Sequence, residues 1–133
     1  MSQAPLILYA DDDIDDQGWL KEAIERHLPT VKMELFGNGI DLLKRLHQCQ
    51  PNEQPCLIIL DINMPGISGK EVLRDIRENP DGKDLKVVLF STSTSELDNV
   101  YAREHGSRLI TKPLTVEQFD FIGKYLAHYC WQD

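Results

Sequence analysis

Three aspartates, a serine and a lysine stand at the ends of apolar runs, where their side chains could act together. They are Asp11 and Asp12 after the first run, Asp61, Ser91 and Lys112. Carboxylates that lie close together repel one another unless some protonate or a cation joins them. Mg²⁺ suits such a cluster, because it prefers oxygen ligands and keeps waters and phosphate oxygens in its remaining positions. The set predicts transfer of a phosphoryl group onto the carboxylate of Asp61, with Lys112 and Ser91 holding the phosphoryl oxygens.

Each of these residues also has a purely structural explanation. An Asp at a strand end often caps the following helix, and a Lys before Pro is usually solvated. The Ser-Thr-Ser run at 91–93 is typical of a loop or a helix cap. The chemical hypothesis therefore depends on the combination, which places four such elements at the ends of four predicted strands.

The apolar pattern predicts five strands that alternate with five helices. Short apolar or alternating runs predict strands at 6–10, 31–36, 57–60, 86–90 and 108–111. Apolar residues at helical spacing predict helices at about 15–28, 40–50, 69–79, 95–105 and 115–130. Ser68 and Ser95 are the predicted N-caps of the third and fourth helices. Alternation with buried strands implies a parallel sheet with helices on both faces, whose ligands bind beyond the carboxyl ends of the strands.

Composition excludes several classes of function. The 133 residues fit one domain, and a net charge of −8 argues against nonspecific binding to nucleic acid or to an anionic membrane. Cys49, Cys56 and Cys130 are an odd number without metal-ligand spacing, so we expect no disulfide framework and a reducing compartment. The sequence has neither a signal-peptide pattern nor an apolar run long enough to span a bilayer, and we expect a cytoplasmic protein.

The sequence resembles the receiver domain family of bacterial two-component signalling over essentially its whole length. The resemblance rests on four segments. An apolar strand with an acidic end lies at 8–13, and the phosphoacceptor segment lies at 57–69. The strand with the hydroxyl residue lies at 87–92, and the segment with the Lys-Pro pair lies at 110–113. It implies a flavodoxin-like (βα)5 three-layer sandwich with a five-stranded parallel sheet of order 2-1-3-4-5. It also implies that residues 1–133 form a single receiver domain without an output domain.

The resemblance assigns a role to each candidate residue. It implies that Asp61 is phosphorylated, and that Ser91 and Lys112 hold the phosphoryl group. The implied Mg²⁺ ligands are Asp12 and Asp61 through side chains, Asn63 through its backbone carbonyl, and Asp11 through water. The chain would catalyse only its own phosphorylation and dephosphorylation, and would not be an enzyme that turns over a substrate.

The resemblance also implies the kind of partner. The donor would be a sensor histidine kinase or a histidine phosphotransfer protein, and an unidentified protein would be the target. The docking surface would combine the elements at 95–105, 108–111 and 115–130. The aromatic segment 125–131 either packs on the body of the domain or forms a dimer or partner contact, since aromatic residues are enriched in interface cores. We expect a monomer or a weak homodimer.

Two positions depart from the family pattern. The family often has an aromatic residue three positions before the lysine, and its rotation reports phosphorylation; here that residue is Leu109. The signal would then pass through the loop that follows the fourth strand. The second position is Ser93, two residues beyond the hydroxyl residue. With Asn63 it would flank the path of the water that hydrolyses the phosphoaspartate, and these small polar side chains leave the lifetime of the phosphorylated state open.

Three other functions can be weighed against this one. A phosphatase of the haloacid dehalogenase type has a second Asp two residues after its nucleophile as general acid and base, where this chain has Asn63. In such enzymes the nucleophile also comes first along the chain and the acidic pair comes late, which is the reverse of the order here. A flavodoxin would need hydroxyls and backbone donors where this chain has Asp11 and Asp12, which would repel a phosphate. A degenerate receiver that serves as a scaffold normally lacks a site residue, and none is missing here.

Overall fold

The computed structural model describes residues 4–92 and 95–131. Its strands are β1 Leu6–Ala10, β2 Lys32–Phe36, β3 Leu57–Leu60, β4 Val87–Ser91 and β5 Arg108–Thr111. Its α-helices are α1 Ile14–His27, α2 Gly39–Gln48, α3 Gly69–Glu78, α4 Glu96–Glu104 and α5 Val116–Trp131. Short 3₁₀ helices at Pro51–Glu53 and Pro80–Gly82 lie in the loops before β3 and β4. No helix of the described ranges is long and apolar enough to cross a membrane.

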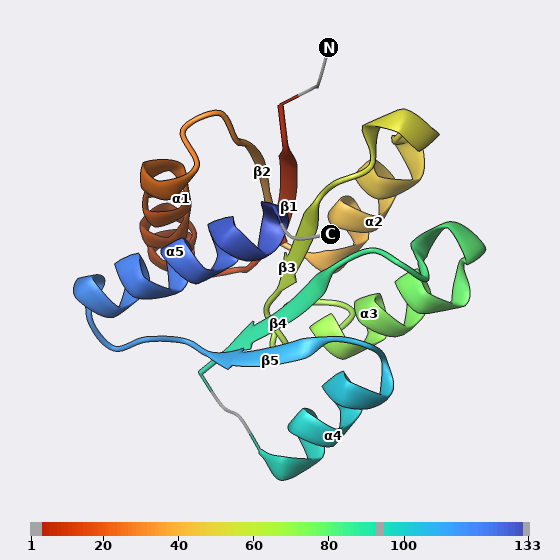
Figure 1. Ribbon diagram of the computed structural model, residues 1–133. Helices are drawn as coiled ribbons and strands as arrows, with labels where there is room; N and C mark the ends of the chain where they lie inside the picture. The colour runs from red at the N-terminus through yellow and green to blue at the C-terminus, as the bar shows by residue number, and fades with distance from the viewer. Residues whose placement is uncertain (1–3, 93–94, 132–133) are drawn as a thin grey trace.

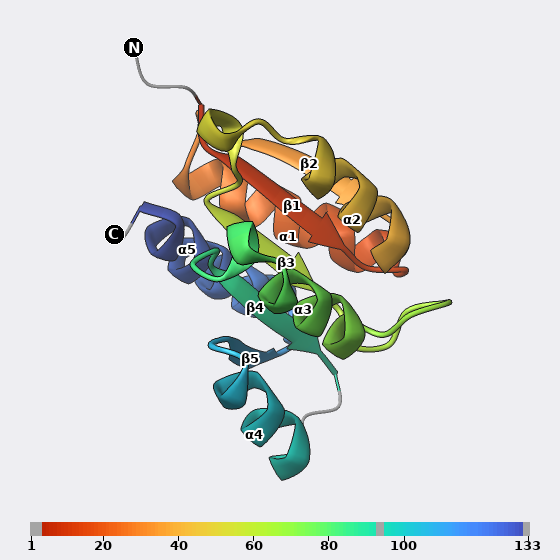
Figure 2. The same cartoon turned by 90° about the vertical axis from the view of Figure 1, so that its right-hand side faces the viewer.

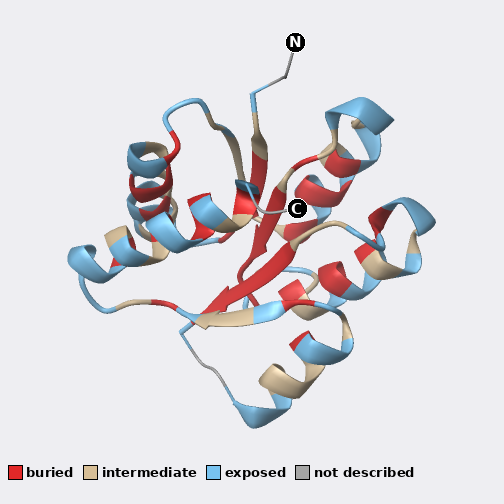
Figure 3. Ribbon diagram, viewed as in Figure 1, coloured by how far each residue is buried: buried red, intermediate tan, exposed pale blue. Residues whose placement is uncertain are grey.

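The five strands form one parallel sheet of order β2-β1-β3-β4-β5 (Figure 1). This confirms the predicted flavodoxin-like fold and strand order. The three central strands are almost wholly buried, whereas β2 and β5, at the edges, are only partly buried (Figure 3). The difference matches the sequence, because the central strands are continuous apolar runs and the segment before Phe36 alternates.

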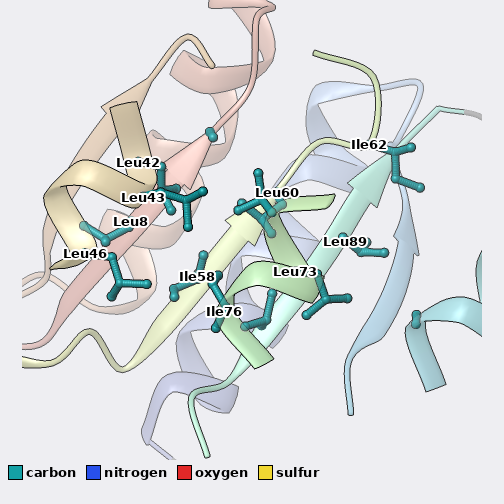
Figure 4. Close-up of a cluster of buried hydrophobic side chains, with 14 residues drawn as sticks. Leu8, Leu42, Leu43, Leu46, Ile58, Leu60, Ile62, Leu73, Ile76 and Leu89 are labelled. Carbon is teal, nitrogen blue, oxygen red and sulfur yellow. The ribbon is translucent and has the colours of Figure 1, made fainter. Parts of the chain in front are cut away.

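Helices cover both faces of the sheet, as Figures 1 and 2 show. Successive residues of a strand point to opposite faces, so each strand serves two cores. Leu8, Ile58 and Leu89 face α2, α3 and α4, where they join the cluster drawn in Figure 4. Tyr9 and Phe90 face the other way, toward α1 and α5. The two cores fix the sheet rigidly between the helices, and thereby fix the ends of its strands.

Side-chain caps begin all five α-helices. Asp13, Asn38, Ser68, Ser95 and Thr115 each accept a hydrogen bond from the backbone N–H three residues further on. Such a cap satisfies one of the donors that the first turn of a helix leaves unpaired. The predicted caps Ser68 and Ser95 are thus confirmed.

The expectation that the chain has no disulfide is wrong in this structure. Cys56, just before β3, is bonded to Cys130 in the last turn of α5, and their Cα atoms are 5.2 Å apart. The two cysteines are separated by 74 positions, and only the return of α5 across the sheet brings them together. Leu126, Ala127 and Cys130 are buried. The aromatic segment therefore packs on the body of the domain, although Trp131 remains 66% exposed.

The crossing of α1 and α5 leads to a first prediction. A Cβ atom at Gly123 would lie 2.4 Å from the Cβ of Ala23 and 2.7 Å from its carbonyl carbon. Gly123→Ala should therefore force the helices apart and lower the free energy of unfolding by about 1–3 kcal/mol in urea titrations. Gly18→Ala is the matched control, because a Cβ there meets nothing within 4 Å. It should raise the free energy of unfolding by about 0.5–1 kcal/mol. Equal effects of the two substitutions would contradict the close crossing.

The disulfide leads to a second prediction. Closing a loop of 74 positions restricts the unfolded chain, so reduction should lower the free energy of unfolding by about 2–4 kcal/mol. Cys130→Ser should reproduce the loss under oxidising conditions. Cys49→Ser is the control, since Cys49 takes no part in the disulfide. A reduced protein as stable as the oxidised one would rule out this contribution.

Candidate functional site

Backbone hydrogen bonds align the carboxyl ends of the strands at one edge of the sheet. The N–H of Asp61 donates to the carbonyl oxygen of Ala10 at 3.0 Å, and the N–H of Lys112 donates to that of Ser91 at 2.8 Å. The N–H of Asp11 likewise donates to Phe36 at 2.9 Å. The sheet hydrogen bonds therefore continue one step beyond the strands. They place the predicted site residues side by side, as parallel strands require.

The ammonium group of Lys112 lies among three carboxylates. Its Nζ is 2.8 Å from Oδ2 of Asp11, 2.9 Å from Oδ2 of Asp16 and 3.1 Å from Oδ2 of Asp61. The Lys112 side chain is only 5% exposed. Burial alone would lower its pKa, but hydrogen bonds to Asp11 and Asp16 and the nearby negative charges outweigh burial and raise the pKa. Lys112 thus stays a fixed positive charge.

Asp11 is completely buried and is held at both carboxylate oxygens. The hydroxyl of Tyr9 donates to its Oδ2 at 2.6 Å, and the N–H of Asp13 donates to its Oδ1 at 2.9 Å. Burial and the charge of Asp11 raise the pKa of Tyr9, so the phenol remains a donor. Nε2 of Gln17 donates to the carbonyl oxygens of Asp11 and Phe36 at 2.6 and 2.9 Å. These hydrogen bonds from α1 therefore hold the turn after β1 in place.

Asp61, the predicted phosphoacceptor, is buried at the end of β3 and is 5% exposed. Its Oδ2 faces Lys112, and its Oδ1 accepts a hydrogen bond from the N–H of Asn63 at 3.2 Å. Burial and the charge of Asp11 outweigh the attraction of Lys112 and raise the pKa of Asp61 to about 6. The carboxylate is thus held in place but destabilised in its charged form.

The acidic residues can supply ligands for a hard cation. Oxygen atoms of Asp11, Asp12 and Asp61 all lie within 4.8 Å of one another. Asp11 and Asp61 are buried, whereas Asp12 is exposed at the mouth of the site. With Asp16, the cluster contains four carboxylates and one ammonium group. An excess of buried negative charge beside carboxylate oxygens fits a divalent cation that takes oxygen ligands, such as Mg²⁺.

The remaining predicted residues border this cluster. Ser91 is fully buried at the end of β4, in register with Thr111 of β5. Asn63 is exposed in the loop that follows Asp61. Ser93, expected beside the path of the hydrolytic water, lies outside the described residues. The structure thus brings Asp11, Asp12, Asp61 and Lys112 into one cluster, with Ser91 and Asn63 beside it.

Two contacts at the site were not predicted from the sequence. Asp16 was assigned only to a helix start, yet it is an ion-pair partner of Lys112. Tyr9 was assigned only to a buried strand, yet its hydroxyl holds Asp11. The signal for Tyr9 was present, because residues two apart in a strand face the same way. No sequence spacing relates Asp16 to Lys112, since the rotation of α1 against the sheet decides that contact.

The loop after β3 folds back tightly on the phosphoacceptor candidate. The N–H of Gly69 donates to the carbonyl oxygen of Ile62 at 2.9 Å. A Cβ atom at Gly69 would lie 2.2 Å from the backbone carbonyl oxygen of Asp61. Only glycine permits this approach, so the first turn of α3 packs directly against the backbone of Asp61.

The raised pKa of Asp61 predicts a pH-dependent stability. An aspartate with a pKa of about 6, against an ordinary 3.8, favours folding when protonated. That stability is complete below the ordinary pKa and is lost as the pH rises through 6. In metal-free buffer at pH 8, Asp61→Asn should therefore unfold at higher urea, with a gain of about 1–3 kcal/mol. At pH 4 the gain should largely vanish.

Two comparisons control this experiment. Asp75→Asn, at an exposed position of α3, should change the free energy of unfolding by less than about 0.5 kcal/mol at either pH. Addition of Mg²⁺ at pH 8 should raise the free energy of unfolding of the natural chain more than it raises that of the Asp61→Asn variant. A variant that is less stable than the natural chain at pH 8 would contradict the electrostatic description.

Known proteins share this sequence pattern. The model of the response regulator receiver domain matches residues 7–120. Protein PilH of Pseudomonas aeruginosa is 29% identical over 113 residues, which cover 84% of this chain and 88% of PilH. Response regulator Rcp1 of Synechocystis sp. is 31% identical over 111 residues, which cover 80% of this chain and 76% of Rcp1.

Solved structures share the fold. The phosphorylated cyanobacterial phytochrome response regulator RcpA matches with a TM-score of 0.85 and 27% identity, over 94% of this chain and 92% of that chain. The Mn²⁺-bound form of response regulator Rcp1 matches with a TM-score of 0.81 and 27% identity, over 92% and 91%. The family model spans most of the chain and both comparisons agree with it. The chain therefore belongs to the response regulator receiver domain family.

Proposed function

We propose that this receiver domain accepts a phosphoryl group on Asp61 in a Mg²⁺-dependent reaction. One observation carries the proposal. The Asp61 carboxylate is buried with the ammonium of Lys112 at 3.1 Å on one side and oxygens of Asp11 and Asp12 within 4.8 Å. A nucleophilic carboxylate, a fixed cation and oxygen ligands for a metal are the parts that phosphoryl transfer to an aspartate requires.

Each residue has a task in the proposed transfer. An oxygen of ionised Asp61 attacks phosphorus, the bond from phosphorus to the donor breaks, and the donor keeps the electron pair of that bond. The aspartyl phosphate carries more negative charge than the carboxylate it replaces, and Lys112 offsets part of that charge. The Ser91 hydroxyl would donate to a phosphoryl oxygen. Asp11, Asp12, Asp61 and the backbone carbonyl of Asn63 would hold Mg²⁺, which neutralises charge on the phosphoryl oxygens when bound.

The position of Asp11 supports its indirect role toward the metal. Tyr9 and the N–H of Asp13 already occupy its two oxygens, and Lys112 shares one of them. Asp12 is exposed in the turn after β1, so its side chain can rotate toward an entering cation. We therefore assign direct ligation to Asp12 and Asp61, and ligation through water to Asp11.

The proposed partners follow from the family. A sensor histidine kinase or a histidine phosphotransfer protein would donate the phosphoryl group, and a further protein would bind the phosphorylated form. The chain would act as a phosphoacceptor switch rather than as an enzyme with multiple turnover, and as a monomer or weak homodimer. We assign docking to the face formed by α4, β5 and α5, where Leu97 and Phe121 are 78% and 75% exposed.

We further propose that the chain acts in the cytoplasm. In a reducing compartment Cys56 and Cys130 would be thiols at rest, because cytosolic disulfides are rare and mostly transient. The disulfide would then mark an oxidised form of the protein.

The phosphorylation chemistry can be tested on the purified chain. Incubation with acetyl phosphate and Mg²⁺ should add a single phosphoryl group, measured as intact mass. Asp61→Asn and a sample with EDTA should both lack the adduct, because the first removes the nucleophile and the second removes the metal. Asp75→Asn is the control, since it removes an exposed carboxylate of α3 and should be phosphorylated normally.

The outcomes separate the possible functions. An adduct that persists in Asp61→Asn would contradict the assignment of the phosphoacceptor. No adduct on the natural chain under any condition would favour a receiver used only as a scaffold.

A further inference from the structure

Helix α4 is held to the rest of the domain by little apolar contact. Ala102 is its only buried residue, and Leu97 is 78% exposed. Each of the other four α-helices in the described chain buries at least three residues. A helix with so few buried apolar contacts opens more readily than its neighbours. Polar contacts must therefore contribute a large share of the free energy that holds α4 against the rest of the domain.

Such contacts converge on Lys70, in the first turn of α3. The Lys70 ammonium pairs with Asp98 in the first turn of α4. The hydroxyl of Tyr101, one turn further along α4, donates to the backbone carbonyl oxygen of Lys70 at 2.7 Å. The Lys70 ammonium also lies 5.4 Å from the centre of the Tyr101 ring, within the range of a cation–π interaction. We call Lys70, Asp98 and Tyr101 the Lys70 cluster.

The Lys70 cluster is partly shielded from water. The side chains of Lys70 and Asp98 are 30% and 14% exposed. The hydrogen bond from Lys70 lowers the pKa of Asp98, so Asp98 stays charged at neutral pH. The N–H of Asp98 also donates to the capping hydroxyl of Ser95 at 3.1 Å. The cluster therefore fixes the beginning of α4, whereas Arg77 of α3 holds its other end by donating to the carbonyl oxygens of His105 and Gly106 at 2.6 and 3.0 Å.

The Lys70 cluster is also close to the phosphoacceptor along the chain. Lys70 directly follows Gly69, whose Cα packs so tightly against Asp61 that a Cβ would come within 2.2 Å of the Asp61 carbonyl oxygen. A shift of the Asp61 backbone must therefore move the first turn of α3. Lys70 lies on that turn and holds α4 by three contacts.

On this face of the domain an aromatic residue comes from α4 and none comes from β5. The receiver pattern often has an aromatic residue three positions before the lysine, where this chain has Leu109. Leu109 and Tyr101 both pack against the core cluster between the sheet and α2, α3 and α4. Tyr101, unlike Leu109, has a hydroxyl that reaches the segment following the phosphoacceptor.

We propose that the Lys70 cluster transmits the phosphorylation state of Asp61 to α4, with Asp98 and Tyr101 as positioning residues. The proposal rests on the proposed phosphorylation of Asp61. It differs from the expectation that the signal passes through the loop after β4. Phosphorylation adds negative charge at Asp61, and the loop from Asp61 to Gly69 changes conformation in response. Lys70 moves with this loop and thereby shifts the first turns of α4.

Hydrogen–deuterium exchange of α4 tests the proposal in the full chain. Exchange is measured over residues 95–106 with and without acetyl phosphate and Mg²⁺, while intact mass gives the phosphorylated fraction. Phosphorylation should change the exchange rate of α4 in the natural chain by about threefold or more, comparable to the effect of one hydrogen bond. Tyr101→Phe and Asp98→Asn should remove most of that change while Asp61 is still phosphorylated.

Two further variants serve as controls. Lys70→Arg keeps the charge and the backbone carbonyl, and should retain the response of α4. Asp120→Asn removes a partner of Arg26 between α1 and α5, far along the chain from the Lys70 cluster, and should also retain it. A purely structural role would raise α4 exchange by the same factor in both states and leave their ratio unchanged.

The possible results are distinct. Variants that are phosphorylated and keep the full change in α4 exchange would overturn the proposal. So would a natural chain that is phosphorylated without any change in α4. A natural chain that gains no phosphoryl group would instead refute the proposed function, and the coupling would fall with it; intact mass alone identifies that case.

Discussion

The ammonium group of Lys112, buried among the carboxylates of Asp11, Asp16 and Asp61, is the interaction on which the site depends. It joins the ends of β1, β3 and β5 with the start of α1. One positive charge does not neutralise these three carboxylates, and Asp12 adds a fourth at the mouth of the site. Burial and this excess of negative charge raise the pKa of Asp61, and the same excess favours binding of a divalent cation. Loss of one carboxylate should relieve repulsion, whereas loss of Lys112 should increase it.

The fold supplies the rigidity that this arrangement requires. Two apolar cores hold the central strands from both faces, and backbone hydrogen bonds beyond the strands fix Asp11, Asp61 and Lys112. Rigidity decreases away from the sheet, since α4 buries only Ala102. The molecule thus combines a fixed site with a loosely held helix a short distance from it. A switch needs both, because a change at the site must alter the stability of some other element.

The sequence predicted those features that depend on local pattern. Continuous apolar runs identified the central strands, and the polar residues that end them, such as Asp11 and Asp61, identified the edge where the site lies. Features that depend on the relative placement of elements were not predicted. The contact of Asp16 with Lys112 requires a particular rotation of α1, and the Cys56–Cys130 disulfide requires α5 to return to the start of β3. The strand order was inferred from the family resemblance and not from the pattern alone.

The central claim is that Asp61, and no other carboxylate of the cluster, receives the phosphoryl group. Borohydride reduces an aspartyl phosphate to homoserine and leaves an ordinary carboxylate intact, so peptide mass spectrometry after reduction identifies the modified position. After incubation with acetyl phosphate and Mg²⁺, we expect homoserine at position 61 and nowhere else in the cluster. Homoserine at position 11, 12 or 16, with Asp61 intact, would contradict it.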